Sequence, residues 1–111
     1  MENCLFCRIA SGEIPSSKVY EDEKVLAFRD IDPQAPVHVL VIPKQHFDSI
    51  LDADPGTVGY MQTIVCKLAK ELGVDENGFR LVVNTGADGQ QSVKHLHMHI
   101  LGGRSMQWPP G

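Results

Sequence analysis

The chain has 111 residues, of which 42% are hydrophobic and 22% charged, and its formal net charge at pH 7 is −4. This length and composition predict one small globular domain, spanning 1–111, with a single core. The acidic balance, without a basic patch, excludes a nucleic-acid-binding surface, and no apolar run is long enough to cross a membrane. The N-terminal segment lacks the pattern of a signal peptide, so we expect a cytoplasmic protein.

The first part of the chain predicts a short helix followed by three strands. Residues 4–10 have the pattern of a short helical turn, and the polar residues 22–23 separate two short strands at 18–21 and 24–29. The proline-rich residues 30–36 predict a loop. The apolar run 37–42 that follows predicts a central strand of the sheet.

A long helix and two further strands complete the expected fold. Asp54 is a suitable N-cap with Pro55 at the first helical position, and Gly73 is suited to end the helix. The residues with helical spacing predict a buried stripe: Val58, Met61, Ile64, Val65, Leu68, Ala69 and Leu72. Cys66 is predicted to be a small packing residue on this helix. Strands at 79–84 and 95–101 then make the chain an α+β domain.

The last predicted strand carries three of the five histidines at alternate positions, His95, His97 and His99. Successive side chains of a strand point to opposite faces, so these imidazoles would share one face, with apolar residues on the other. Imidazole is suited to proton transfer, nucleophilic attack on phosphorus or metal binding near neutral pH. A solvated strand face that is rich in histidine is the alternative.

The loop that precedes this strand has the composition of an anion-binding turn. Gly86 and Gly89 allow backbone N–H groups to turn toward an anion, and Asn84 and Ser92 flank the loop. Many loops with two glycines are only turns. Next to a strand of histidines, however, this loop predicts a phosphate site beside an imidazole nucleophile.

The cysteines suggest a second site. Cys4 and Cys7 have the spacing of a paired ligand motif, and His46 and His95 could complete a set of four zinc ligands. Zinc bound by four protein side chains would be structural, since no coordination position stays open for water. Two reduced thiols, or a redox-active dithiol, are the alternatives.

The histidine stretch, together with residues 28–43 and 101–111, resembles the histidine triad family of nucleotide hydrolases and transferases. Within that family the chain is similar to the histidine triad nucleotide-binding protein branch. The resemblance covers essentially the whole chain. It implies an α+β fold with an antiparallel sheet, one long helix and a short N-terminal helix, which dimerises into a continuous sheet.

The resemblance also implies roles in catalysis. His97 would be the nucleophile that attacks the α-phosphorus of a purine nucleoside phosphoramidate, forming a nucleotidyl-histidine that water then hydrolyses. His99 would handle the proton of the leaving group, and His38 would support the triad through hydrogen bonds. Asn84 and Ser92 would orient the phosphoryl oxygens.

The same resemblance implies a nucleotide pocket. Asp30 would bind the ribose hydroxyls, and Trp108 in the C-terminal tail would reach the active site of the partner. The apolar slot for the purine would be formed by Ile14, Phe28, Ile31 and Leu40. Gln90 stands where this branch usually has a glycine, which makes a backbone contact to phosphate there less assured.

Several alternatives stay open from the residues alone. Asp30 could cap its own loop through an Asx-turn, His38 could be a structural histidine, and Ser92 could bond its own backbone. The apolar slot cannot be separated from ordinary core. The alternative functions are hydrolysis of dinucleoside polyphosphates and a non-catalytic module that binds nucleotide or metal.

Overall fold

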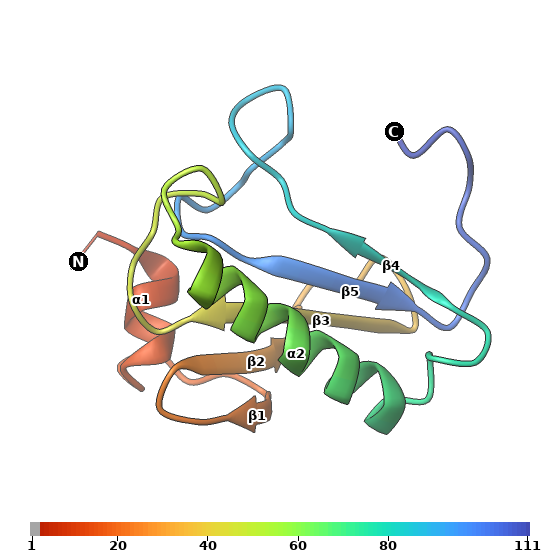
Figure 1. Ribbon diagram of the computed structural model, residues 1–111, viewed down its shortest axis with the longest axis horizontal. Coiled ribbons are helices and arrows are strands. Elements are labelled where there is room, and N and C mark those ends of the chain that lie inside the picture. The colour runs from red at the N-terminus through yellow and green to blue at the C-terminus, as the bar shows by residue number, and fades with distance from the viewer. Residues whose placement is uncertain (1–2) are drawn as a thin grey trace.

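The computed structural model describes residues 3–111, and within them the chain forms one antiparallel sheet of five strands and two helices (Figure 1). The strands follow the order β1-β2-β3-β5-β4 across the sheet. In chain order the elements are α1 (Leu5–Ala10), β1 (Lys18–Glu21), β2 (Val25–Arg29), β3 (Val37–Pro43), α2 (Pro55–Glu71), β4 (Phe79–Val82) and β5 (Met98–Gly102). The expected α+β class with an antiparallel sheet is confirmed.

Helix α2 covers one face of the sheet (Figure 1). Its predicted start is confirmed, because the Asp54 side chain accepts a hydrogen bond from the Thr57 backbone N–H, and Pro55 occupies the first turn. Its buried residues are Met61, Ile64, Val65, Leu68 and Ala69. They pack on alternate residues of β2 and β3, among them Val25 and Val39. The prediction for Cys66 was wrong, since this residue is exposed on the outer side of α2.

The opposite face of the sheet is covered by α1. Phe6 and Ile9 of α1 pack there with Leu26 and Phe28 of β2 and with Leu40 of β3. These strand residues alternate with those under α2, because successive side chains of a strand point to opposite faces. The sheet therefore has a helix-covered core on each side, and α1 meets it next to the histidines.

The predicted histidine strand is shorter than expected. β5 begins at Met98, so His95 and His97 precede it, because the Leu96 backbone N–H donates to the carbonyl of Phe47 in a loop rather than to a neighbouring strand. The alternation of faces nevertheless continues through this segment. Leu96 and Met98 pack in the core under α2, whereas the rings of His95 and His97 contact Phe6 of α1.

Candidate functional site

A pocket of about 220 Å³ lies between α1, strands β2 and β3, and the histidine segment. Its lining includes seven of the residues predicted for the site: Phe28, Asp30, Ile31, Leu40, Ser92, His97 and His99. α1 contributes Leu5, Phe6 and Ile9, which were not predicted to line the site. Their apolar character was visible in the sequence, but nothing local shows that residues 5–9 lie beside residues 92–99.

The Nε2 atom of His97 is unprotonated. Its Nδ1 lies 2.7 Å from the backbone carbonyl oxygen of His95. A carbonyl oxygen only accepts, so Nδ1 carries the proton, and Nε2 of the neutral ring has a lone pair. Burial lowers the pKa of His97 below its ordinary value, which favours this neutral form. The residue is 2% exposed, and it lines the pocket.

His38 and His99 continue the hydrogen-bond chain behind His97. The Gln34 backbone N–H donates to His38 Nδ1 at 3.0 Å, so the proton of the neutral ring is on Nε2, which lies 2.9 Å from His99 Nδ1. His99 therefore carries its own proton on Nε2, a buried atom that has no hydrogen-bond partner within residues 3–111. Burial, with the neighbouring His97 and His38, lowers the pKa of His99 to about 4.

Asp30 lies at the open end of this chain. One carboxylate oxygen accepts the backbone N–H of Asp32 at 2.8 Å, so the Asx-turn is present, and the other lies 3.4 Å from His38 Nε2. The possible ligand atoms of Asp30, His38 and His99 lie within 4.8 Å of one another, a spacing that metal sites also have. The proton that His38 Nε2 carries between them makes this group a hydrogen-bond chain instead.

The loop that follows β4 is held by hydrogen bonds between its own residues. The N–H groups of Gln90 and Gln91 donate to carbonyl oxygens of the same loop, and the Gly86 N–H donates to the Gln91 side chain. Gln91 in turn donates to the Asp48 carbonyl at 2.6 Å. These amides are therefore already bonded, and the loop presents Ser92, which is exposed, to the pocket.

Four residues predicted for the catalytic and nucleotide site lie outside the lining of the pocket, and one of them is His38, which lies behind His99. Ile14 packs beside α1, and Asn84 is half-buried just beyond the end of β4. Trp108 is 81% exposed in the tail, where the guanidinium of Arg80 lies 5.8 Å from its ring. Of the slot predicted from the sequence, Phe28, Ile31 and Leu40 lie together at the pocket.

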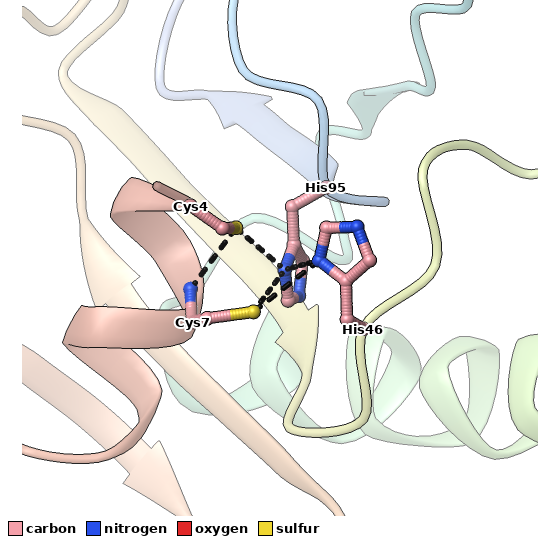
Figure 2. Close-up of side chains that lie close together, drawn as sticks. All are labelled: Cys4, Cys7, His46 and His95. Carbon is pink, nitrogen blue, oxygen red and sulfur yellow. Dashed lines mark hydrogen bonds between the residues drawn. The ribbon is translucent and has the colours of Figure 1, made fainter. Parts of the chain in front are cut away.

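The four predicted metal ligands, Cys4, Cys7, His46 and His95, lie together in a second cluster (Figure 2). Cys4 Sγ and Cys7 Sγ lie 3.2 and 3.4 Å from His95 Nδ1, and Cys7 Sγ lies 3.2 Å from His46 Nδ1. The two Nδ1 atoms are themselves 3.2 Å apart. Ligand atoms around a tetrahedral zinc ion are separated by roughly 3.3–3.8 Å, so the spacing of this cluster suits zinc.

The hydrogen bonds around the cluster also prepare it for a cation. His95 Nε2 lies 2.8 Å from the Pro43 carbonyl, and His46 Nε2 lies 2.8 Å from the Asp48 carboxylate. Both partners are acceptors, so each ring has its proton on Nε2 and directs the lone pair of Nδ1 toward the two sulfur atoms. Burial and the neighbouring Cys4 raise the pKa of the Cys7 thiol to about 11, so without a cation Cys7 keeps its proton.

Comparison with known proteins places this geometry in a family. Residues 11–106 match the HIT domain. The chain is 50% identical to an uncharacterised HIT-like protein of Synechococcus elongatus, over 99% of this chain and 98% of that protein. It is also 50% identical to a 14 kDa zinc-binding protein of Zea mays, over 96% of this chain and 87% of that protein.

Solved structures agree with the sequence matches. A HIT family hydrolase from Legionella pneumophila superposes with a TM-score of 0.96 at 51% identity, covering 98% of this chain and 100% of that one. A histidine triad protein from Clostridium difficile gives a TM-score of 0.92 at 51% identity, covering 96% of each chain. The chain therefore belongs to the HIT domain family, and its small α+β fold with an antiparallel sheet is the one that these family members have.

Proposed function

We propose that this protein is a purine nucleoside phosphoramidate hydrolase of the histidine triad nucleotide-binding branch. The observation that carries the proposal is the tautomer of His97, whose Nε2 lone pair belongs to a side chain of the pocket lining. An unprotonated imidazole nitrogen is a nucleophile for phosphorus at neutral pH. The similarity to HIT family hydrolases supports a hydrolytic reaction.

The reaction proceeds in two displacements. His97 Nε2 attacks the α-phosphorus of adenosine 5′-phosphoramidate, the P–N bond breaks, and the amine leaves with a proton that His99 helps to deliver. Water then attacks the same phosphorus and returns to His99 the proton that the amine took, the Nε2–P bond breaks, and AMP leaves while His97 regains its lone pair. Splitting one substitution into two lowers the barrier of each.

The other pocket residues hold the nucleotide. The apolar wall of the pocket, with Phe6 and Phe28, takes the purine, and Asp30 takes the ribose hydroxyls. Asn84 and Ser92 orient the phosphoryl oxygens. His38 acts as a positioning residue, since it fixes the ring of His99 through the 2.9 Å contact.

The test is turnover of adenosine 5′-phosphoramidate by the wild type and by His97→Ala. We expect the variant to lose roughly a thousandfold or more in kcat, as the loss of a nucleophile does, while it keeps AMP binding in a calorimetric titration. Mass spectrometry of acid-quenched wild-type protein should show one nucleotidyl group on the peptide that contains His97. Undiminished turnover by the variant would exclude His97 as the nucleophile.

The same assay separates the alternative functions. Faster hydrolysis of diadenosine polyphosphates than of the phosphoramidate would identify a dinucleoside polyphosphate hydrolase. AMP binding without turnover of either substrate would identify a non-catalytic nucleotide-binding module. The exposed Trp108 would affect the choice of leaving group if, as we propose, two chains pair and each tail reaches the site of its partner.

We further propose that the cluster of Cys4, Cys7, His46 and His95 binds one zinc ion and that the protein acts in the cytoplasm. Zinc would supply four bonds that join distant segments, and the chemistry of the reaction would not need it. The name of the zinc-binding relative from Zea mays supports the assignment. Within residues 3–111 the protein has no helix of the length and apolarity that a membrane span requires.

A further inference from the structure

The metal cluster and the nucleotide pocket share the same short segments. Two of the proposed ligands, Cys4 and Cys7, lie at the start of α1, and between them lies Phe6 of the pocket lining. A third ligand, His95, is two residues from His97. Only His46 comes from elsewhere, the segment after β3, and it does not line the pocket.

His95 connects the metal cluster to the nucleophile through its backbone. Its ring is held on one side by the cluster and on the other by the Pro43 carbonyl, 2.8 Å from Nε2. Its own carbonyl oxygen then accepts the proton of His97 Nδ1 at 2.7 Å. Whatever fixes His95 therefore also fixes the tautomer that leaves His97 Nε2 unprotonated.

Phe6 provides a second connection, on the α1 side. Its ring lies edge-on to the rings of His97 and His95, with centroid separations of 5.0 and 6.0 Å, and 5.6 Å from the ring of Phe28. Phe6 is 5% exposed, so its position depends on how α1 sits on the sheet. When α1 moves, one wall of the pocket moves with it.

α1 is too short to hold this position by its own stability. It has six residues, and isolated helices much shorter than about 12–15 residues are marginal in water. Its attachments are the packing of Phe6 and Ile9 and the two cysteines of the cluster. A bound cation replaces weak thiol contacts by two metal–sulfur bonds, and so it adds the strongest of these attachments.

We propose that metal binding at the Cys4–Cys7–His46–His95 cluster controls nucleotide binding, with Phe6 and His95 as the positioning residues that transmit it. The metal-free chain samples states in which α1 is displaced and His97 lacks its fixed tautomer. The apparent affinity for nucleotide then falls by the fraction of chains that remain competent. This inference rests on the proposed function, since it regulates that same pocket.

His46 is the site for the decisive substitution, because its removal leaves α1, His97 and the pocket lining chemically intact. We expect His46→Ala to lose zinc, measured by metal analysis, and to bind AMP about tenfold more weakly in calorimetry, as a competent fraction of roughly one in ten would produce. His46→Cys keeps a fourth zinc ligand, and we expect it to recover both zinc and AMP affinity.

Two further measurements exclude a general loss of structure. Wild-type protein stripped of zinc by a chelator should show the same weakening, reversed by added zinc chloride, even where His46→Ala fails to fold. Ring ¹⁵N shifts of His97 should report one tautomer with zinc and a mixture without it.

Several outcomes would overturn the inference. These are unchanged AMP affinity in zinc-stripped wild type, unchanged affinity in His46→Ala, or weak binding by His46→Cys that has bound zinc. Failure of the zinc-loaded wild type to bind AMP at all would instead reject the proposed nucleotide site. The failure of the inference and the failure of the function are thus distinguishable.

Discussion

At the scale of single residues, the site depends on where four histidine protons lie. Backbone groups set three of them directly, because the Gln34 N–H donates to His38, the His95 carbonyl accepts from His97, and the Pro43 carbonyl accepts from His95. The neutral state of these rings matters as much as their positions. It follows from burial, which disfavours the charged imidazolium.

The depressed pKa values predict a dependence of stability on pH. The pKa of His99 falls from its ordinary 6.5 to about 4, chiefly through burial, and burial also lowers that of His38. Between these pH values the unfolded chain binds more protons than the folded one, so the free energy of unfolding should fall as the pH is lowered through this window. Above it, the contribution is fully present.

Urea unfolding of wild type and His99→Asn, at pH values from 4 to 7.5, measures this dependence. We expect the slope of stability against pH to be smaller in the variant, since one depressed imidazole is gone. Equal slopes in the two proteins would show that other groups carry the acid sensitivity.

A second prediction concerns the backbone at Gln90. Its φ is 60°, a left-handed conformation that costs a residue with a side chain about 1–2 kcal/mol. We expect Gln90→Gly to stabilise the fold by about 0.5–1 kcal/mol. This is less than the strain that the substitution removes, because glycine also makes the unfolded chain more flexible. The matched control is Gly86→Ala at φ 72°, which should destabilise it. A loss of stability in Gln90→Gly, measured by thermal unfolding, would contradict the assigned strain.

Residue types could be predicted at this scale, but contacts could not. The spacing of the histidines and of Cys4 and Cys7 was sufficient to select side chains that the structure brings together. The tautomer of His97 was not predictable, because it depends on a bend of the backbone before β5. The positions of Leu5 and Phe6 in the pocket were not predictable for a similar reason. Phe6 packs on His97, about 90 residues further along the chain, and the sequence around Phe6 does not indicate such a partner.

At the scale of elements, one carboxylate joins the first hairpin to α2. Asp22 accepts hydrogen bonds from the backbone N–H groups of Lys24 and Val25 and from the hydroxyls of Tyr20 and Tyr60. Burial alone would raise the pKa of Asp22, but these hydrogen bonds, led by that of Tyr60, lower it to about 2. The ionised carboxylate of Asp22 therefore connects the hairpin to α2 through hydrogen bonds.

Removal of the Tyr60 hydroxyl should weaken this tie. We expect Tyr60→Phe to lower the free energy of unfolding by about 1.5–3 kcal/mol, the range for a hydrogen bond to a charged group. Thr63→Ala, which removes an exposed hydroxyl on the same helix, is the control and should change it much less. Equal changes in the free energy of unfolding of the two variants, measured with urea, would show that the hydrogen bond to Asp22 contributes no more than an exposed hydroxyl does.

The elements themselves were largely predictable, because their signals are local. The helix from Asp54 to Gly73 follows from its cap, its apolar spacing and the glycine at its end. The start of β5 was misplaced by three residues, since the ladder with β3 begins only at Val41 and Met98. The first residue of a strand depends on where its partner strand begins to pair with it, and the sequence of one segment does not contain that information.

At the scale of the whole molecule, the two edges of the sheet differ. β1 carries charged residues at both ends, Lys18 and Glu21, and an irregular register, which are features that discourage strand pairing. The opposite edge, β4, exposes Phe79 and Leu81, at 36% and 39%. The Arg80 side chain holds the tail near this edge, with Nη2 donating to the Gln107 carbonyl at 2.9 Å.

These differences predict that two chains pair through β4. Sedimentation velocity should give a dimer for wild type and a monomer for Phe79→Glu combined with Leu81→Glu, because like charges would face each other across the contact. Leu51→Glu alters an apolar residue that is 82% exposed in a loop, and it should stay dimeric. A monomeric wild type would reject the pairing.

The distance in sequence between the metal ligands has a consequence for biosynthesis. Cys4 and His95 are 91 residues apart, so one ion would close a loop that includes all of β1 to β4. The ribosome delivers both cysteines first, then His46, and His95 only after those four strands have emerged. A complete set of the four proposed ligands thus exists only in a chain translated past His95, and a product truncated earlier lacks both the last of these ligands and the proposed nucleophile.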